Sequence, residues 1–289
     1  MVAIRTVLCP VDLSAASARQ VDLAAQLCRL FAARLVVHHN LATLPVGAAV
    51  GWMWQGGRGE APTEDDVEAR VRALLARLPG GVEHEARITR GLPSQTVMAV
   101  GDLVGADLVI LATHGDSHQE HTSVTEQLLE HSERSLLVLH ERDVASGPPD
   151  FLSPGSPHVA LVPTDLAAGS RGAEELACEL AARAPVELHL LHVAEPKRRG
   201  EPQPDDIETA MRARLPEALV GKARLHVAEG DPAAAIDGAA RRLGAGCIVM
   251  GEHTKSFLRR WLSPDVSRAL LHQAPCPVWY VPAGRAGAA

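Results

Sequence analysis

Aromatic residues are scarce in this sequence. Phe, Tyr and Trp make up only 3% of the 289 residues, although apolar residues together make up 46%. The cores must therefore be built mainly from Ala, Val and Leu, whose compact side chains suit close packing of helices on a sheet. The length itself predicts two domains of ordinary size.

Clusters of positive charge and long apolar runs are also missing. The net charge is −7 and Lys and Arg form no basic block, which argues against a nucleic-acid surface because such surfaces need clustered cations. No apolar stretch reaches the ~18 residues typical of a transmembrane helix. The opening MVAIRTVLCPVD is predicted to lead into a strand and not to be a signal peptide. We therefore expect neither nucleic-acid nor membrane partners.

The cysteines form no CxxC pair. They are Cys9, Cys28, Cys178, Cys247 and Cys276. Cys9, Cys178 and Cys247 lie in apolar or helical patterns, where a free Cys behaves as a small apolar side chain. This usage is typical of a reducing, cytoplasmic protein.

Motifs of common enzyme classes are absent as well. The sequence contains no GxSxG nucleophile elbow, no HExxH zinc motif and no P-loop lysine motif. It gives no support for nucleophilic catalysis, so we expect a protein that is not an enzyme.

An internal repeat decides the expected architecture. TVLCPVDLSAASARQVDLAAQL in the first half corresponds to HVALVPTDLAAGSRGAEELACEL in the second. Each copy has an apolar strand, a proline, an aspartate two residues later and an Ala-rich helix, so Asp12 and Asp165 correspond. Further on, each half has a helix that begins at Pro93 or Pro232, a glycine-containing stop and a buried strand.

Strands that alternate with helices predict βαβ units and a parallel sheet with helices on both faces. We expect an α/β fold of two tandem, doubly wound, Rossmann-like domains, each with a five-stranded parallel sheet, related by a pseudo-twofold axis. The expected domains are residues 1–143 and 158–285, joined by a Pro-, Gly- and Ser-rich linker at 144–157. The final strands, SLLVLH and PVWYVP, should pair with each other as a pseudo-dimer, or with a second chain as a homodimer.

The repeated segments resemble the universal stress protein family, and the whole chain is similar to a tandem, two-domain member. The resemblance rests on VLCPVDLSAAS and ALVPTDLAAGS, on GADLVILATHG and GAGCIVMGEHT, and on HQAPCPVWYVP. It implies a role in stress response, with ATP bound by some members and not by others. ATP-binding members carry, after the fourth strand, a Gly, two residues, a Gly, nine residues, a Gly and then Ser or Thr. These glycines let backbone N–H groups approach the phosphates.

The first copy of this loop is shortened. Ala112 stands at the first glycine, Gly115 is kept, and only six residues separate Gly115 from Thr122 and Ser123. The hydroxyl partner of the phosphates therefore survives as Ser123, and ATP with Mg²⁺ remains a possible cofactor of the first domain.

The second copy keeps the spacing but loses the chemistry. Gly251 is kept, Thr254 replaces the second glycine, and Pro264 and Asp265 stand where Gly and Ser or Thr are expected. Proline lacks an N–H donor. Two negative charges ~4 Å apart repel by ~4 kcal/mol at an effective dielectric near 20. We expect no ATP in the second domain.

The resemblance implies nucleotide contacts from the Asp after strand one, from the backbone at the end of strand two and from the loop after strand four. The candidates are Asp12, Asn40, Gly115 and Ser123 in the first domain, and Asp165, Val193 and Gly251 in the second. Both aspartates fall at the carboxyl end of a strand, the usual ligand edge of an open α/β sheet. The alternative role for each is to cap the helix that follows.

A His-rich segment, THGDSHQEH, suggests a metal site. His114, His118 and His121 lie close to two carboxylates in sequence, and His with carboxylate suits zinc or nickel. The alternative is a solvated loop that happens to be rich in His.

These features predict a non-enzymatic, cytoplasmic stress-response protein with degenerate nucleotide loops that binds a small ligand or a partner. One alternative is an ATP-binding regulatory protein that uses only the first domain, through Asp12, the backbone at Asn40, Gly115 and Ser123. The other is a weak ATP hydrolase, for which the sequence offers no evident base to activate water.

Overall fold

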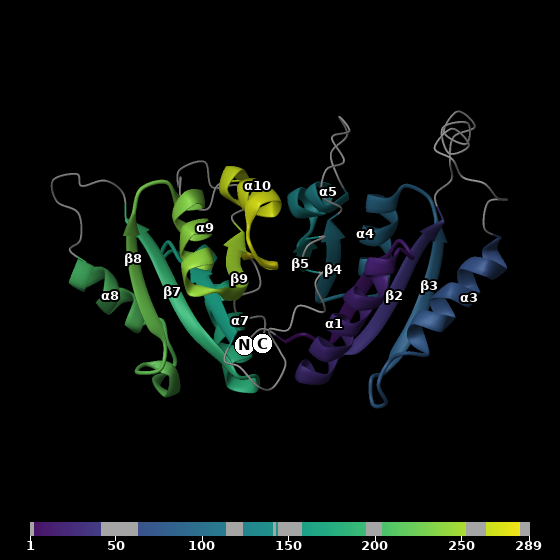
Figure 1. The fold of residues 1–289 in the computed structure, drawn as a ribbon, viewed down its shortest axis with the longest axis horizontal. Coiled ribbons are helices and arrows are strands. Elements are labelled where there is room, and N and C mark those ends of the chain that lie inside the picture. The colour runs from purple at the N-terminus through teal and green to yellow at the C-terminus, as the bar shows by residue number, and fades with distance from the viewer. Residues whose placement is uncertain are drawn as a thin grey trace.

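The structure, a computed structural model, describes residues 3–41, 63–113, 124–140, 143, 158–194, 204–252 and 264–283. Strands and helices alternate along the chain, and the second half repeats the order of the first (Figure 1). The first half contains β1 (Thr6–Val11), α1 (Ala15–Phe31), β2 (Arg34–Leu41), α3 (Glu64–Leu75), β3 (His84–Arg90), α4 (Pro93–Val104), β4 (Leu108–Thr113), α5 (Val124–His131) and β5 (Ser135–His140). The second half contains β6 (His158–Pro163), the 3₁₀ turn η1 (Ala168–Ser170), α7 (Arg171–Arg183), β7 (Val186–Ala194), α8 (Pro204–Arg212), the 3₁₀ turn η2 (Glu217–Leu219), β8 (Arg224–Glu229), α9 (Pro232–Leu243), β9 (Ala245–Glu252), α10 (Pro264–Gln273) and β10 (Val278–Pro282).

Local sequence explains the limits of the two matching helices α4 and α9. Pro93 and Pro232 stand at their first helical positions, where the missing N–H has no intrahelical partner to lose. Gly105 and Gly244 end them with φ of 63° and 59°, left-handed values that glycine adopts without a Cβ penalty. Both predicted helix starts are confirmed.

The strands of the described residues form one sheet in the order β3-β2-β1-β4-β5-β10-β9-β6-β7-β8. Neighbours are parallel within each half, whereas β5 and β10 pair antiparallel, with Leu137 opposite Trp279. The order of the second half mirrors that of the first, as two copies related by a pseudo-twofold axis require. The predicted fold class is confirmed, and the final strands pair with each other within the chain.

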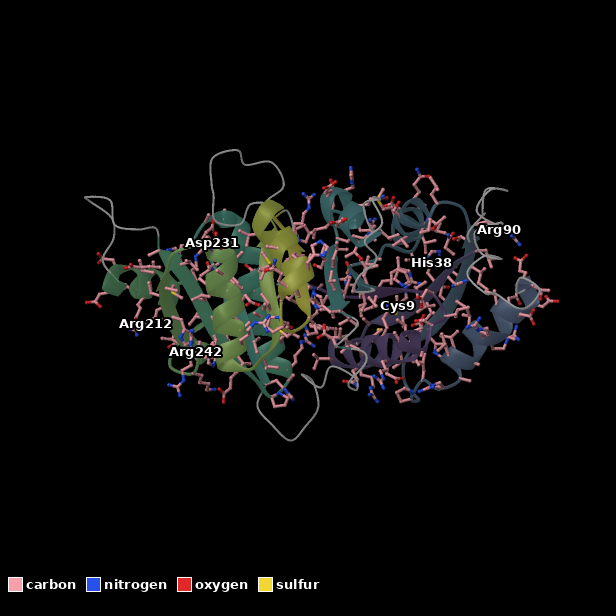
Figure 2. All side chains as sticks on the ribbon, turned by 45° about the horizontal axis from the view of Figure 1, so that its top comes forward. Cys9, His38, Arg90, Arg212, Asp231 and Arg242 are labelled. Carbon is pink, nitrogen blue, oxygen red and sulfur yellow. The ribbon has the colours of Figure 1, made fainter. Side chains whose placement is uncertain are left out.

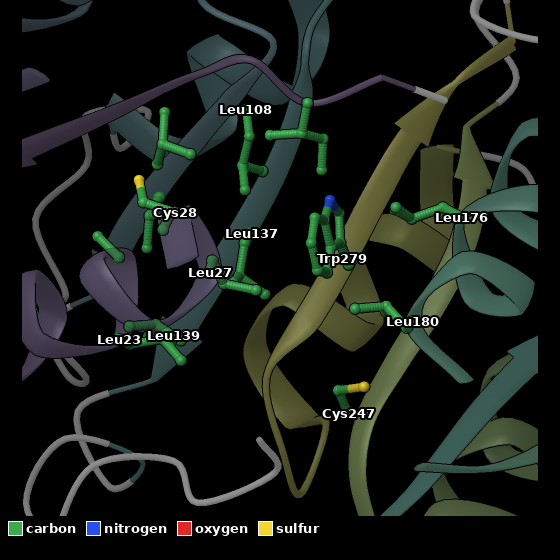
Figure 3. Packing of buried hydrophobic residues seen from close by; sticks show 14 of the residues in the cluster. Leu23, Leu27, Cys28, Leu108, Leu137, Leu139, Leu176, Leu180, Cys247 and Trp279 are labelled. Atoms are coloured by element: carbon green, nitrogen blue, oxygen red, sulfur yellow. The ribbon is translucent and has the colours of Figure 1, made fainter. Parts of the chain in front are cut away.

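Helices cover both faces of this sheet (Figure 1). Helices α1, α3, α7 and α8 bury their apolar residues in one cluster, and α4, α5, α9 and α10 in a second cluster on the other face. Each cluster contains residues from both halves. Figure 3 shows the first cluster at the junction, where the fully buried Trp279 lies between Leu27 and Leu137 of one half and Leu176 and Leu180 of the other.

Polar and aromatic contacts also join the halves. Arg268 on α10 donates to Glu130 on α5 at 2.8 Å. On the other face, the Phe31 ring meets Trp279 edge-on with centroids 6.4 Å apart, and the Arg183 guanidinium lies 5.6 Å from the Phe31 centroid. Aromatic and cation–π contacts of this kind add to the burial of apolar area.

His140 forms a further bridge between the halves. Its Nδ1 lies 3.0 Å from Asp143 Oδ2, and its Nε2 lies 2.9 Å from the carbonyl oxygen of Leu271 in α10. A carboxylate and a carbonyl can only accept hydrogen bonds. Through these two contacts the ring links Asp143 to α10 of the second half.

All five cysteines are unbridged. Burial raises the pKa of the Cys28 and Cys247 thiols to about 12 and that of Cys178 to about 11, so these thiols stay protonated and unreactive. Within the described ranges, none of the helices combines the length and apolar character needed to span a bilayer.

Candidate functional site

A cavity of about 350 Å³ lies at the carboxyl ends of β1, β2 and β4 in the first half. Strand β1 pairs with β2 along all of Thr6–Val11, but with β4 only at Val7 and Leu8. The chain leaves β1 toward β2 on one side, while β4 lies on the other. The strand order therefore reverses between β1 and β4, and open α/β sheets bind ligands at such a point.

Gln20 of α1 bridges β1 and β4 beyond their last paired residues. Its Nε2 donates to the carbonyl oxygens of Pro10 at 2.8 Å and Ile110 at 2.7 Å, and the side chain is only 3% exposed. Buried carbonyl groups need a donor, and the amide supplies it where the β1–β4 ladder has ended. Gln20 thus holds the two strands in place and forms part of the cavity wall.

Asp12 organises the turn that leads into α1. Its Oδ1 accepts from the Ser14 N–H and from the Ser17 hydroxyl, both at 2.8 Å. Leu13 between them has φ of 63°, a left-handed value that costs a residue with a Cβ about 1 kcal/mol. The N-cap of α1 is Ser14, so Asp12 does not cap the helix itself but holds the turn that precedes it. Asp12 also lines the cavity, and its contact with a ligand stays a prediction.

Three polar side chains on the paired strands β2 and β3, those of His38, Asn40 and Thr89, are linked by hydrogen bonds next to the cavity. Asn40 Nδ2 donates to the Gly91 carbonyl oxygen at 2.9 Å, and its Oδ1 lies 3.4 Å from the Thr89 hydroxyl. That hydroxyl lies 2.8 Å from His38 Nε2. His38 and Asn40 both line the cavity, and His38 lies in the interior of the first half (Figure 2). The predicted backbone contact of Asn40 with a nucleotide stays a prediction.

Burial controls the charge of His38. It lowers the pKa of the imidazole to about 4, and the neighbouring His39 contributes in the same direction. His38 is therefore neutral at physiological pH. The cavity wall presents an uncharged imidazole there.

His39 and its counterpart His192 in the second half make the same contact. His39 Nδ1 lies 2.8 Å from the Val11 carbonyl oxygen, and His192 Nδ1 lies 2.8 Å from that of Thr164. Since a carbonyl only accepts, Nδ1 carries the hydrogen in both rings. The repeated contact ties the first two strands of each half together. Beside His192, the candidate Val193 buries its side chain in an apolar cluster, so only its backbone can face a ligand.

The strand end at Gly251 differs from its counterpart in the first half. A Cβ at Gly251 would lie 2.5 Å from the Gly169 carbonyl oxygen and 3.0 Å from Ser170 Cα. Glycine is needed here because the backbone of η1 comes close. In the first half the corresponding residue is Ala112, which lines the cavity. A glycine that the sequence assigned to phosphate binding thus has a packing role.

Asp165 repeats the arrangement of Asp12 and fixes this turn. Its Oδ1 accepts from the Ala167 N–H at 2.8 Å and the Ser170 hydroxyl at 2.7 Å. Leu166 has φ of 60°, matching Leu13. Asp165 likewise precedes the caps of η1 and α7, Ala167 and Ser170, and its ligand contact stays a prediction.

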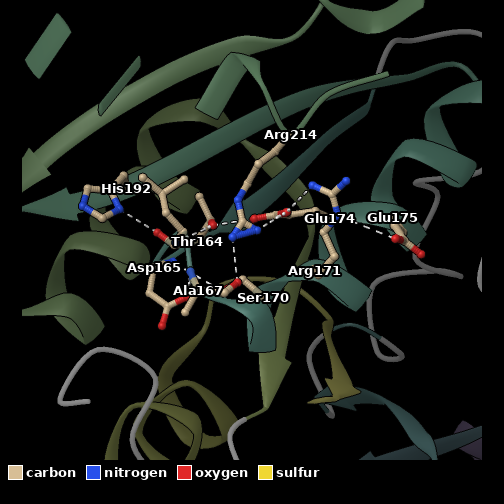
Figure 4. A network of polar contacts seen from close by, with 10 residues as sticks. Thr164, Asp165, Ala167, Ser170, Arg171, Glu174, Glu175, His192 and Arg214 are labelled. Atoms are coloured by element: carbon tan, nitrogen blue, oxygen red, sulfur yellow. Dashed lines mark hydrogen bonds and ion pairs between the residues drawn. The ribbon is translucent and has the colours of Figure 1, made fainter. Parts of the chain in front are cut away.

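A buried network holds the same turn from behind (Figure 4). Glu174, only 2% exposed, accepts from the Thr164 hydroxyl at 2.6 Å and from Arg214 Nη1 at 3.1 Å, while Arg214 Nη2 donates to the Ala167 carbonyl oxygen at 2.7 Å. Burial raises the pKa of Glu174 above its usual range, although these hydrogen bonds oppose the shift. The network fastens the Asp165–Ser170 turn against Gly251. The first-half counterpart of Glu174 is the apolar Val21.

A larger cavity of about 1030 Å³ lies elsewhere in the second half. It is bounded by α7, by Val186–Leu188 at the start of β7 and by the segment around η2. The carboxyl ends of parallel strands, where ligands of this fold class bind, lie at the opposite edge of the sheet. The size of this cavity therefore does not make it the counterpart of the first-half site.

Several sequence candidates lie outside the described residues. They are Gly115, Ser123, His114, His118 and His121. Pro264 and Asp265 begin α10, and the Asp265 side chain also lies outside the description. In the part of the chain that the structure describes, no three His, Cys, Asp or Glu side chains are grouped to hold a metal ion.

Sequence reasoning missed His38 and Gln20 as parts of the site. Both carry a visible signal, since His38 is a polar residue within the apolar run of β2 and Gln20 lies on the Ala-rich, buried side of α1. A polar residue in such a pattern is buried and needs partners. The sequence alone does not say which partners these are.

Comparison with known proteins follows the same division into halves. The model of the Universal stress protein family matches residues 3–140 and again residues 158–282. No curated protein sequence gives a significant match.

Solved structures resemble the chain over nearly its full length. A universal stress protein from Archaeoglobus fulgidus DSM 4304 is 18% identical with a TM-score of 0.68, and the alignment covers 96% of this chain and 98% of that one. A functionally unknown protein from Pseudomonas aeruginosa PAO1 is 17% identical with a TM-score of 0.64, and the alignment covers 97% and 93%. At such identities the likeness establishes the tandem fold and no more.

Proposed function

Because the chain belongs to the universal stress protein family, we propose that it acts in stress response by binding a small ligand in its first half, without catalysing a reaction. The observation that carries this proposal is the cavity at the carboxyl ends of β1, β2 and β4. In the second half, the Gly169 carbonyl oxygen fills the space beside the matching strand end. The two halves share a fold, but at the carboxyl ends of their strands the first has a cavity and the second has the backbone of Gly169.

The cavity fits a ligand with a flat apolar part and a polar rim. Its volume of about 350 Å³ falls at the low end of the ~300–1,000 Å³ usual for ligand pockets. Pro10, Val97 and Leu111 supply apolar walls, and Asp12 and Asn40 supply polar groups. We propose a ligand that contains adenosine, with ATP and Mg²⁺ as the first to test. The resemblance assigns the phosphates of ATP to Gly115 and Ser123, which lie outside the described residues.

Binding without catalysis fits the roles of the polar groups around the cavity. Asp12 Oδ1 is engaged in the turn before α1, and His39 Nδ1 is engaged in the contact that ties β2 to β1. The unbridged cysteines fit a reducing compartment such as the cytoplasm. A protein that binds a common nucleotide in the cytoplasm would change its binding to a partner as the concentration of that nucleotide changes.

Calorimetric titration with ATP and Mg²⁺ tests the proposal. We expect saturable binding of one ligand per chain, with no release of inorganic phosphate above the rate in protein-free buffer. The matched variants are Asp12→Asn and Asp165→Asn, because Asn keeps an oxygen for the turn but removes the charge and replaces the second acceptor oxygen by an NH2 donor. A hydrogen bond to a charged group contributes about 1.5–3 kcal/mol, so Asp12→Asn should weaken binding at least about tenfold.

Asp165→Asn should leave the affinity unchanged within about twofold. Equal losses in the two variants would refute the assignment to the first half. Turnover with phosphate release would refute the non-catalytic role, and the absence of binding would refute an ATP ligand.

A further inference from the structure

The wall of the first-half cavity contains a buried polar atom without a partner among the described residues. This atom is Nδ1 of His38, a side chain that is 1% exposed and lines the cavity. Folded proteins rarely leave a buried donor or acceptor unpaired, and the exceptions often serve a function. Because His38 lines the cavity, a ligand bound there is the candidate partner for this atom.

The neighbouring hydrogen bonds show whether Nδ1 donates or accepts. The Gly91 carbonyl oxygen only accepts, so the Asn40 amide nitrogen faces it and Asn40 Oδ1 faces Thr89. Asn40 Oδ1 also only accepts, so the Thr89 hydroxyl donates to it. The hydroxyl oxygen then accepts from His38 Nε2 at 2.8 Å. One assignment satisfies all three contacts, and it puts the hydrogen of His38 on Nε2.

His38 Nδ1 is then a lone-pair acceptor inside the wall of the site. The lowered pKa of the ring, about 4, keeps this lone pair free of a proton at physiological pH. The neighbouring His39 does not donate to this lone pair, since its Nδ1 hydrogen points to the Val11 carbonyl oxygen.

We propose that His38 determines ligand specificity by accepting a hydrogen bond at Nδ1 from an N–H or O–H group at the buried end of the ligand. The 6-amino group of adenosine is such a donor. This inference rests on the proposed function and names which group of the ligand the first half selects. A ligand without the donor leaves the buried acceptor unpaired, and sites of this kind reject such ligands strongly.

The second half offers the matched comparison. His38 lies opposite Pro10 in the β1–β2 ladder, and Leu191 lies opposite Pro163 in the β6–β7 ladder. Leu191 is fully buried and has no polar atom in its side chain. His38→Leu therefore places in the first half the residue that the same fold accommodates in the second.

The test compares adenosine with purine riboside, which differs only by lacking the 6-amino group. We expect the wild-type protein to bind adenosine at least about tenfold more tightly in calorimetry. His38→Leu should bind both within about twofold of each other. An unchanged preference in His38→Leu would overturn this inference and leave the proposed function standing. Equal affinity of the wild-type protein for the two nucleosides would also overturn this inference alone, whereas failure to bind ATP or either nucleoside would overturn both.

A second measurement needs no ligand and no variant. Nitrogen-15 NMR of the histidine rings should show His38 protonated at Nε2 and unprotonated at Nδ1 in the free protein, and adenosine should shift the Nδ1 resonance. A ring protonated at Nδ1 would overturn the inference. Thr89→Val keeps the imidazole but removes the acceptor for Nε2, so it should reduce the preference for adenosine while the resonances of the remaining fold stay in place.

Discussion

Replacing Gly251 by Ala tests whether protein backbone fills the second-half site. The added Cβ would lie 2.5 Å from the Gly169 carbonyl oxygen and 3.0 Å from Ser170 Cα. Both neighbours are backbone atoms, so no side chain can rotate away. The turn must move instead, against the hydrogen bonds that hold Asp165 and Ala167. Overpacking of this kind costs about 1–3 kcal/mol.

Gly238→Ala is the matched control, because it makes the same change where there is room. Gly238 lies inside α9, and no heavy atom lies within 4 Å of the position that its Cβ would take. Alanine in a helix interior is more favourable than glycine by about 0.5–1 kcal/mol. The two variants should therefore shift the free energy of unfolding in opposite directions.

Urea unfolding followed by circular dichroism measures both shifts. The midpoint should fall for Gly251→Ala and rise for Gly238→Ala, with unchanged slopes. Amide exchange should also accelerate in the turn around Ser170 for Gly251→Ala alone. A Gly251→Ala protein as stable as the wild type would refute the packing role, and the glycine would again be open to a ligand.

Two further predictions concern buried histidines. The unfolded chain takes up a proton at His38 near pH 6.5, whereas the folded chain keeps the ring neutral down to about pH 4, so stability should fall by up to about 3 kcal/mol as the pH drops from 6.5 to 4. His38→Leu should remove this part of the pH dependence measured by urea unfolding, and an unchanged slope would contradict the burial argument. His140→Leu leaves the Asp143 carboxylate and the Leu271 carbonyl oxygen without their shared partner, and should cost about 3 kcal/mol. The control His131→Leu changes an exposed ring and should stay within about 0.5 kcal/mol of the wild type; equal effects of the two would contradict the bridge.

The architecture was predictable because its signals are local and repeated. Pro93 and Pro232 mark helix starts without knowledge of any contact. The final strands are short and apolar, which indicated that each needs a neighbour, and they pair with each other. The domain limits at residues 143 and 158 stay a prediction.

The site was less predictable because it depends on contacts between distant residues. Gly251 matches a phosphate-binding pattern in sequence, yet the reason for the glycine is Gly169, in a turn far earlier in the chain. Adjacent residues of a strand point to opposite faces, and helices cover both faces here. The sequence of His38 and His39 therefore does not reveal which ring has a nitrogen without a hydrogen-bond partner. The hydrogen bonds from Asn40 to Thr89 and on to His38 identify that nitrogen as Nδ1 of His38.

The aspartates show a different limit. The sequence allows two roles for Asp12 and Asp165, a ligand contact or a helix cap. In the structure both Oδ1 atoms accept hydrogen bonds within the turn before the helix. These roles do not exclude each other, because a carboxylate has two oxygens and several acceptor positions. The difference between the halves comes from their surroundings, where Gly169 and the Glu174–Arg214 network close one site.

A crystal structure of the full chain grown with adenosine would show directly whether the first-half cavity is the ligand site. We expect one nucleoside per chain, with its base between Pro10 and Leu111 and its 6-amino group within hydrogen-bond distance of His38 Nδ1. No nucleoside should lie beside Gly251. Adenosine bound at the second-half strand ends, with the first-half cavity empty, would contradict this expectation.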